Sequence, residues 1–270
     1  MGIIYVLWLR QIKRYFRSRA RIVGSLGQPL LFFLALGFGF GPVFQRAGQG
    51  NYIQFLAPGV IAMTVLFSGI FNGIELIWDR QFGFLKETLV APVSRVTIMI
   101  GRTLGGATTS VMQGLIVAIA CLIFGFRPNS AMAIVGGVVF MTLIAIMFTA
   151  LGTAIASVLS DFQGFQMVMN FLVMPLYFLS GAMFPMTSAP AWLKSLMAVD
   201  PLTYGVDAFR NVVFSNTSIT DGSLTQPLID VARAGGLVRF QLGFDVALMV
   251  IVAIVLAWAG AWQFSKAQAA

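Results

Sequence analysis

A polar, charged stretch separates two long apolar runs of this sequence, and it reads Trp78-Asp79-Arg80-Gln81-Phe82-Gly83-Phe84-Leu85-Lys86-Glu87-Thr88-Leu89-Val90-Ala91-Pro92-Val93-Ser94-Arg95. Phe82, Leu85 and Leu89 follow one another at i, i+3 and i+7, and Pro92 ends the pattern. The charged and amide side chains lie elsewhere around the same helix. This pattern predicts a short amphipathic helix at a membrane surface. The alternative is a solvated loop that only returns the chain to the bilayer.

The composition is that of an integral membrane protein. Of the 270 residues, 59% are hydrophobic and 10% are charged, which is too apolar to cover a soluble globule with polar side chains. A bilayer core of roughly 30 Å takes about 20 helical residues, so the length allows about six spans and leaves little for a soluble domain. We expect an all-α polytopic membrane protein in which residues 1–270 form a single transmembrane domain.

The apolar runs predict six membrane-spanning helices, over residues 22–44, 53–77, 98–126, 133–157, 165–184 and 242–264. Lysine and arginine gather before the first span and after the second, whereas the short loops 45–52 and 127–132 carry one arginine each. By the positive-inside rule, both termini and the loop 78–102 are cytoplasmic and the long segment 185–241 lies outside. The same rule explains the formal charge of +8, so this charge does not indicate nucleic-acid binding. We expect the protein to lie in the plasma membrane, namely the inner membrane of a bacterium.

The N-terminal 21 residues have one apolar face and one cationic face. The apolar side chains are Ile4, Leu7, Trp8, Ile12, Tyr15 and Phe16, and the cations are Arg10, Lys13, Arg14 and Arg17. This predicts an interfacial helix over residues 1–21 that lies flat on the anionic inner surface. A basic tail that only sets the topology is the alternative.

The sequence contains no motif that indicates catalysis, metal binding or ATP binding by this chain. There is no histidine and one cysteine, which removes the usual transition-metal ligands, and no GxxxxGK[ST] loop for ATP. The few carboxylates are scattered over several loops. The centres of the spans carry no Asp, Glu, Lys, Arg or His, and Glu75 and Asp245 lie near span ends, whereas ion-coupled carriers usually keep such groups at membrane depth. We therefore expect no catalytic residue, metal or cofactor here, and an energy supply from a soluble partner that acts on the cytoplasmic loops.

Two short amphipathic helices are expected in the outer segment. Ser188-Ala189-Pro190 offers a cap and an early proline for a helix with Trp192, Leu193, Leu196 and Met197 on one face. Asp200-Pro201 starts a second helix with Leu202, Tyr204, Val206 and Phe209, in which Asp207 and Arg210 are spaced at i, i+3 for pairing. These helices are either surface decoration or re-entrant helices that close the pathway.

Glycines recur inside the spans, as at Gly69 and Gly73 in the second and at Gly152 with Ala156 in the fourth. Small residues at i and i+4 let helix backbones approach closely in lipid. We expect them to serve packing within one bundle rather than a dimer face.

Two groups of residues resemble a known family over nearly the whole chain. The first is Ser180-Gly181, Phe184-Pro185, Pro190-Ala191-Trp192-Leu193, Asp200-Pro201-Leu202-Thr203-Tyr204, Asp207 and Arg210, and the second is Arg80, Gly83, Leu85-Lys86-Glu87-Thr88-Leu89-Val90-Ala91-Pro92-Val93-Ser94-Arg95. The chain is similar to permeases of the type-2 ABC exporter class, which includes drug-resistance, nodulation-factor and O-antigen exporters. Family members often carry an acidic residue where Lys86 stands.

The resemblance implies a six-helix subunit that forms a homodimer, with an N-terminal interfacial helix, outer re-entrant helices, and a separate ATP-binding cassette subunit that holds ATP and Mg. It implies a coupling helix in the loop 78–102, with contacts from Arg80, Phe82, Gly83, Leu85, Lys86, Glu87, Leu89, Pro92 and Arg95. It also implies an outer gate of Phe184, Pro185, Trp192, Pro201, Tyr204, Asp207 and Arg210.

The leading functional hypothesis is the membrane half of an ATP-driven exporter. An apolar pathway without fixed charges suits an amphiphilic or lipid-like substrate, such as a drug, a lipid or a glycan-lipid. An ion-independent channel or facilitator is the first alternative, and it predicts no soluble partner. A membrane-embedded lipid-modifying enzyme is the second, and the scattered carboxylates speak against it.

Overall fold

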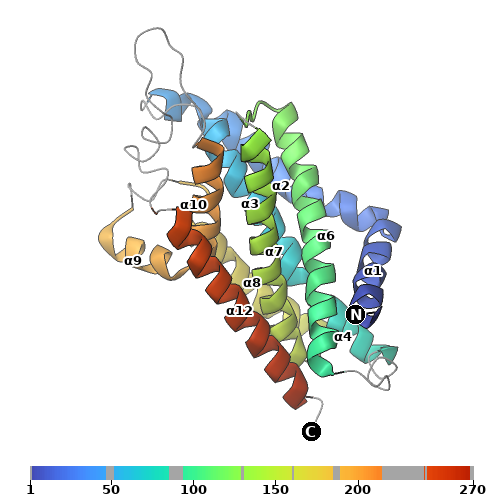
Figure 1. Ribbon diagram of the computed structural model, residues 1–270. Helices are drawn as coiled ribbons and strands as arrows, with labels where there is room; N and C mark the ends of the chain where they lie inside the picture. Colours follow the sequence, from blue (N-terminus) through green and yellow to red (C-terminus); the bar gives the residue numbers. More distant parts are fainter. Residues whose placement is uncertain are drawn as a thin grey trace.

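The computed structural model of the chain describes residues 2–46, 52–84, 94–128, 131–159, 161–184, 189–214, 240 and 242–267. Within these ranges every regular element is a helix, and the helices form one elongated bundle (Figure 1). Their bounds are α1 Gly2–Arg17, α2 Arg19–Arg46, α3 Tyr52–Phe71, α4 Ile74–Gln81, α6 Arg95–Ile123, α7 Ala131–Val158, α8 Phe162–Leu179, α9 Ala191–Val199, α10 Pro201–Phe214 and α12 Leu242–Ala267.

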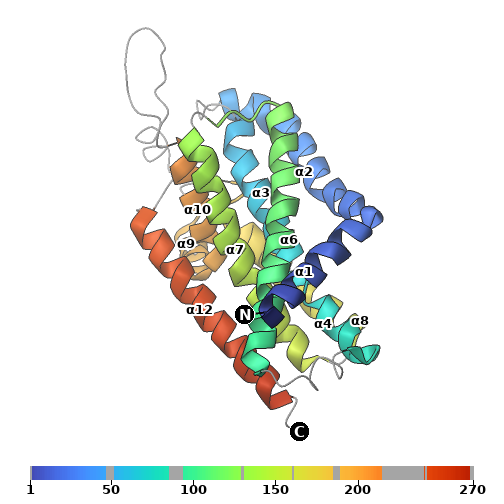
Figure 2. The ribbon, with the colours of Figure 1, turned by 45° about the vertical axis from the view of Figure 1, so that its right-hand side comes forward.

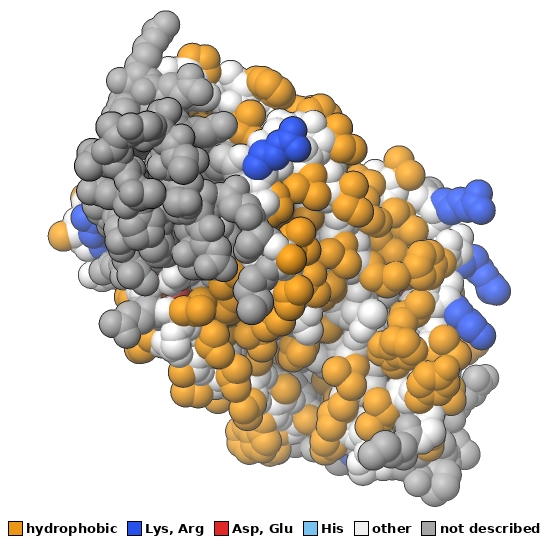
Figure 3. Space-filling view, turned by 45° about the horizontal axis from the view of Figure 1, so that its top comes forward, with side chains coloured by type: hydrophobic (Ala, Val, Ile, Leu, Met, Phe, Trp, Pro, Cys, Tyr) orange, Lys and Arg blue, Asp and Glu red, His pale blue; other side chains and the backbone are white. Residues whose placement is uncertain are grey.

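Six helices are long and apolar enough to cross a membrane, at Ile22–Val43, Tyr52–Gln81, Arg95–Ile123, Ala133–Val158, Phe162–Leu179 and Leu242–Phe264. The predicted all-α polytopic fold with six spans is therefore confirmed. The N-terminus and the end of α12 lie at the same end of the bundle, beside α4 (Figure 1). Apolar side chains cover most of the face shown in Figure 3, as expected of a surface that meets lipid.

The second span is the centre of the bundle. In its apolar 18-residue window, 72% of the residues are buried, whereas the share is 17% in the first span and 17% in the last span. Figure 2 shows α3 behind α6 and α7, with α2 on its other side. Glycine makes this packing close, because a Cβ at Gly73 would meet the carbonyl oxygen of Gly152, and a Cβ at Gly152 would meet that of Ile70. Gly69, Gly73 and Gly152 thus serve helix contacts inside the chain, as predicted.

The second span is not one continuous helix. It turns at Asn72 and Gly73, where the N–H of Gly73 donates to the carbonyl of Ile70 at 3.0 Å in place of an i−4 partner. The Asn72 amide donates to the carbonyl of Gly106 at 2.9 Å and to the hydroxyl of Ser110 at 3.1 Å, both on α6. The break is therefore held by the neighbouring span, and α4 forms a short separate segment below it.

The N-terminal helix α1 packs on α6, and the two helices run in the same direction, since Leu7 lies at Gly101 and Tyr15 binds Gln113. The predicted place of α1 flat on the membrane surface stays a prediction. Ideal Cβ atoms at Gly101 and Gly105 would lie 3.1 Å from Leu7 Cβ and 2.6 Å from Gln11 Cγ. The two glycines, one helical turn apart, therefore leave a shallow channel in α6 that α1 occupies.

The two short helices predicted between the fifth and sixth spans are present as α9 and α10, with corrections in detail. Figure 1 places α9 midway along the bundle and α10 beside α7 and α12. Pro190 is the N-cap residue of α9 and makes no side-chain cap bond. The face predicted to hold four apolar side chains is divided, because Leu193 and Met197 pack inward, whereas Trp192 and Leu196 are 67% and 50% exposed.

Candidate functional site

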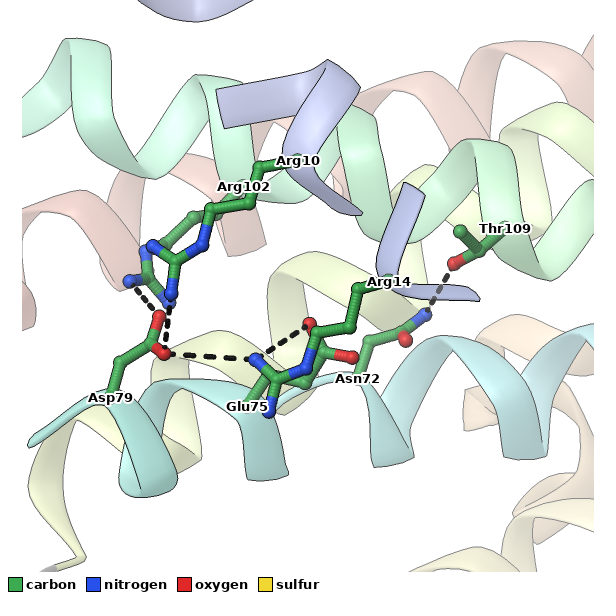
Figure 4. A network of polar contacts seen from close by, with 7 residues as sticks. All are labelled: Arg10, Arg14, Asn72, Glu75, Asp79, Arg102 and Thr109. Atoms are coloured by element: carbon green, nitrogen blue, oxygen red, sulfur yellow. Dashed lines mark hydrogen bonds and ion pairs between the residues drawn. The ribbon is translucent and has the colours of Figure 1, made fainter. Parts of the chain in front are cut away.

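Three helices bring charged side chains together at the end of the bundle that carries the termini (Figure 4). Arg102 of α6 donates to Asp79 Oδ2 of α4 at 2.5 Å, and Arg10 of α1 donates to Asp79 Oδ1 at 2.8 Å. Arg14 of α1 lies 3.6 Å from Asp79 and 3.8 Å from Glu75. One carboxylate thus joins the N-terminal helix, the second span and the third span.

Burial decides how strongly this charge cluster holds the helices. The Asp79 and Arg102 side chains are 5% and 4% exposed, whereas those of Arg10 and Arg14 are 39% and 34% exposed. Removing one partner of a buried ion pair leaves an uncompensated charge and costs about 3–5 kcal/mol, while an exposed pair contributes about 0–1 kcal/mol. The Asp79–Arg102 pair is therefore the structural link, and the two α1 arginines add the outer contacts.

The same end of α4 is also attached to α7. Arg80 donates to the carbonyls of Ser157 at 2.9 Å and Leu159 at 3.1 Å, where the last turn of α7 leaves carbonyls without helical partners. The sequence analysis assigned Arg80 to the contact with a separate ATP-binding subunit. In the structure its guanidinium faces α7, so it acts on the position of α4.

Phe82 is not part of the amphipathic helix that the sequence predicted over the residues after it. The preceding helix α4 ends at Gln81, Phe82 is its C-cap, and Gly83 has φ +81°, which a continuous right-handed helix does not allow. Phe82 therefore does not share a helix with the residues beyond Gly83. Phe82 and Phe84 are 72% and 49% exposed. The predicted contacts Leu85, Lys86, Glu87, Leu89 and Pro92 lie outside the described residues.

The third span begins at Arg95, the last predicted coupling contact. Ser94 is its N-cap, and the Ser94 hydroxyl accepts a hydrogen bond from the N–H of Thr97 at 3.2 Å. The chain thus leaves α4 at a glycine turn and re-enters the bundle at a capped helix start. Both ends of the intervening segment are fixed to the bundle by local hydrogen bonds.

Polar contacts continue from α1 into the bundle. The Tyr15 hydroxyl donates to Gln113 Oε1 at 2.6 Å, and the Gln113 amide donates to Ser25 Oγ at 2.7 Å, which links α1, α6 and α2. Trp8 Nε1 donates to Thr108 Oγ1 at 3.0 Å. The sequence analysis placed Trp8 and Tyr15 on the apolar face of an interfacial helix, and in the structure both side chains bind α6.

The sequence analysis quoted Asp79 and gave the loop 78–102, but it did not bring Asp79, Glu75 and Arg102 together in one site. A signal for the site was present, because Asn72, Glu75 and Asp79 recur at i, i+3 and i+7 in an otherwise apolar helix. Such a stripe predicts a polar helix contact. Its partners on α1 and α6 could not be predicted, since they lie 69 and 23 residues away from Asp79 in the sequence.

At the other end of the fold, Arg210 of α10 holds the turn after α8. Its guanidinium donates to the carbonyls of Gly181 and Ala182, each at 3.0 Å, and of Phe55 at 3.3 Å, and it lies 3.9 Å from the centre of the Phe55 ring. Burial lowers the pKa of Arg210 to about 10. Arg210 therefore joins α10, the α8–α9 turn and the second span.

The other predicted gate residues do not form one cluster with Arg210 among the residues that the structure describes. Asp207, expected to pair with Arg210, accepts from the N–H of Phe240 at 2.9 Å, and the Tyr204 hydroxyl donates to the carbonyl of Ala198 at 2.6 Å. The remaining gate residues divide as follows: Phe184 packs on α9, Pro201 opens α10, Trp192 is exposed, and Pro185 lies outside the described residues.

The carboxyl of Asp200 caps the N-terminus of α10. Its Oδ1 accepts from the N–H of Leu202 at 2.9 Å, while Oδ2 is buried without a hydrogen-bond partner. Burial raises the pKa of Asp200 to about 7, and the hydrogen bond from Leu202 opposes this rise. The cap predicted from Asp200-Pro201 is thus present, in an environment that disfavours its charged form.

The comparisons with known proteins agree with this architecture. A family model described as ABC-2 type transporter matches residues 3–214. The chain is 27% identical over 260 residues to the putative transport permease ycf38 of Porphyra purpurea, which covers 94% of this chain and 88% of that protein. It is 27% identical over 208 residues to Nodulation protein J of Azorhizobium caulinodans, which covers 76% and 81% of the two chains.

Proposed function

Because the chain belongs to the ABC-2 type transporter family, we propose that it is the membrane half of an ATP-driven exporter, powered by a separate ATP-binding cassette subunit. The chain is a multi-pass transmembrane transport subunit, and the family implies such a partner in general. In the proposed mechanism, closure of the ATP-binding subunits on nucleotide acts on the loop after α4 and shifts the bundle between two states. ATP drives the shift only insofar as the assembly binds it better in one state than in the other.

The observation that carries this proposal is the attachment of α4 to three neighbours at its loop end. Asp79 joins it to α1 and α6, and Arg80 joins it to α7. A displacement of the chain at Gly83 therefore cannot be absorbed by α4 alone. It moves the helices with which α4 shares these contacts, and the break at Asn72 and Gly73 gives the lower segment a point at which to turn.

For the cargo, we propose an amphiphilic or lipid-like molecule, such as a drug, a lipid or a glycan-lipid, moved out of the cytoplasm or inner leaflet. The long apolar faces and the scarcity of charge in the spans support this class. We also propose a homodimer, because the first and fifth spans are only 17% and 22% buried within one copy and present apolar faces. The proposed site is the bacterial inner membrane, with both termini inside, on the strength of the lysine and arginine distribution.

The test uses the full chain with the ATP-binding subunit from the same organism. The chain alone should hydrolyse no ATP, and the two should co-purify and export together. Leu85→Asp places an unpaired charge in the predicted apolar contact, so it should abolish co-purification without preventing membrane insertion. Lys86→Arg is the matched control and should behave like the parent. ATPase activity from the isolated chain, or co-purification of the Leu85→Asp variant at the parental level, contradicts the proposal.

A further inference from the structure

A groove of about 480 Å³ lies between α1 and the end of α4. One wall carries the four cations Arg10, Lys13, Arg14 and Arg17 of α1, and the other carries Asp79 and three aromatic side chains, Trp78, Phe82 and Phe84. The proposed transport function uses the end of α4 but leaves most of the α1 wall without a role.

The groove has more positive than negative charge. The four cations of α1 and Arg102 of α6, five in all, face the two carboxylates of Glu75 and Asp79, which leaves three positive charges over. Asp79 accepts from Arg10 of α1 at 2.8 Å and from Arg102 of α6 at 2.5 Å, so its single negative charge is shared between two guanidinium groups. Neither Lys13 nor Arg17 has an ion-pair partner among the residues that the structure describes. An anion fits this wall.

The aromatic wall indicates that the anion has an apolar part. The Arg14 guanidinium lies 5.4 Å from the centre of the Trp78 ring, and the Arg10 guanidinium lies 5.8 Å from that of Phe84. Trp78 also lines a second cavity, of about 350 Å³, with Met63, Phe67, Phe71 and Phe162 among its apolar lining. The basic groove and the largely apolar cavity therefore meet at one side chain, Trp78.

We propose that these two spaces form a binding site for an anionic phospholipid, with its phosphate in the basic groove and an acyl chain along the apolar cavity. The phosphate would meet Lys13 and Arg17, which are exposed, and the guanidinium groups of Arg10 and Arg14. An acidic protein surface would match the cations as well, but it would leave the adjoining apolar cavity unused. The site is independent of the exported cargo, so this proposal can be tested separately from the transport function.

Quenching of Trp78 fluorescence by brominated lipids tests this proposal. The chain has five tryptophans, and Trp8→Phe, Trp192→Phe, Trp258→Phe and Trp262→Phe together leave only Trp78. The purified full chain is reconstituted in phosphatidylcholine vesicles, and either brominated phosphatidylglycerol or brominated phosphatidylcholine is added at equal, low mole fraction. At that mole fraction, brominated phosphatidylglycerol should quench Trp78 more strongly than brominated phosphatidylcholine does. A matched chain that keeps Trp192 of α9 instead should show no such preference.

Charge removal then assigns the preference to the groove. Each cation near an anionic lipid contributes about five-fold in binding, so Lys13→Gln with Arg17→Gln should reduce the preference about 25-fold. The control, Arg127→Gln with Lys194→Gln, removes the same charge outside the groove and should leave the preference intact.

Two further measurements separate the sources of the anion. Inorganic phosphate at millimolar concentration should not displace the lipid, and addition of the ATP-binding subunit should not abolish the preference. Equal quenching by the two lipids, an unchanged preference in the Lys13→Gln, Arg17→Gln chain, displacement by phosphate alone, or complete displacement by the soluble subunit would each overturn the proposal.

Discussion

Neutralising Asp79 should release the N-terminal helix and the third span from α4 together. Asp79→Asn keeps the size of the side chain but leaves the Arg102 guanidinium, which is 4% exposed, without its carboxylate. A buried pair broken on one side costs about 3–5 kcal/mol, and Arg10 and Arg14 lose weaker, partly exposed contacts of about 0–1 kcal/mol each. We therefore expect a loss of roughly 3–7 kcal/mol in the free energy of unfolding.

The assay is a double-mutant cycle on the full chain in detergent or bicelles, read by the denaturant midpoint of unfolding. Asp79→Asn and Arg102→Gln should each be strongly destabilising, and the double variant should be much less so than their sum, since neither buried charge then remains. Arg10→Gln is the control and should change stability by no more than about 1 kcal/mol. The reasoning is refuted if Asp79→Asn costs no more than Arg10→Gln, or if the two central variants are simply additive.

Three further changes test other contacts. Arg210→Met removes the donor to three buried carbonyls and should destabilise the chain by about 2–4 kcal/mol in the same unfolding assay, whereas a loss below about 1 kcal/mol would contradict its assigned role. The pKa of Asp200 is raised to about 7 in the fold, so the folded state binds its proton more tightly than the unfolded state does and stability should fall as pH rises from about 4 to 7. Asp200→Asn keeps the acceptor for the helix cap and should remove that part of the pH dependence; parallel pH profiles for parent and variant would show that the carboxyl does not titrate there. Gly73→Ala places a methyl group against the carbonyl of Gly152 and should cost about 1–3 kcal/mol, while Gly39→Ala, with open space around it, should be neutral or slightly stabilising in a thermal melt.

The spans could be predicted because each rests on local evidence. About 20 apolar residues in a row must form a helix in lipid, and the six runs were long enough that neighbouring structure could not change the outcome. The start of α10 at Asp200-Pro201 was predictable for the same reason, since a cap and a first-turn proline act within four residues.

The site could be predicted only in part, because its contacts join distant segments. The pattern of α1 showed which face is apolar but not what covers it, and a channel made by Gly101 and Gly105 fits that face as well as lipid does. The break at Gly83 could not be predicted, because Phe82, Leu85 and Leu89 keep a helical spacing across it and a single glycine does not rule out a helix. Its positive φ is the feature that separates Phe82 from the following residues.

The packing of α1 on α6 also sets an order of events during synthesis. Trp8 and its partner Thr108 are 100 residues apart, so at about 5–20 residues per second the ribosome needs roughly 5–20 s to make the second after the first. Throughout that interval the face of α1 that later packs on α6 lacks this partner, and a membrane surface could shield its apolar side chains. The amphipathic pattern of α1 suits both settings, a membrane surface before α6 has been made and the glycine channel of α6 afterwards.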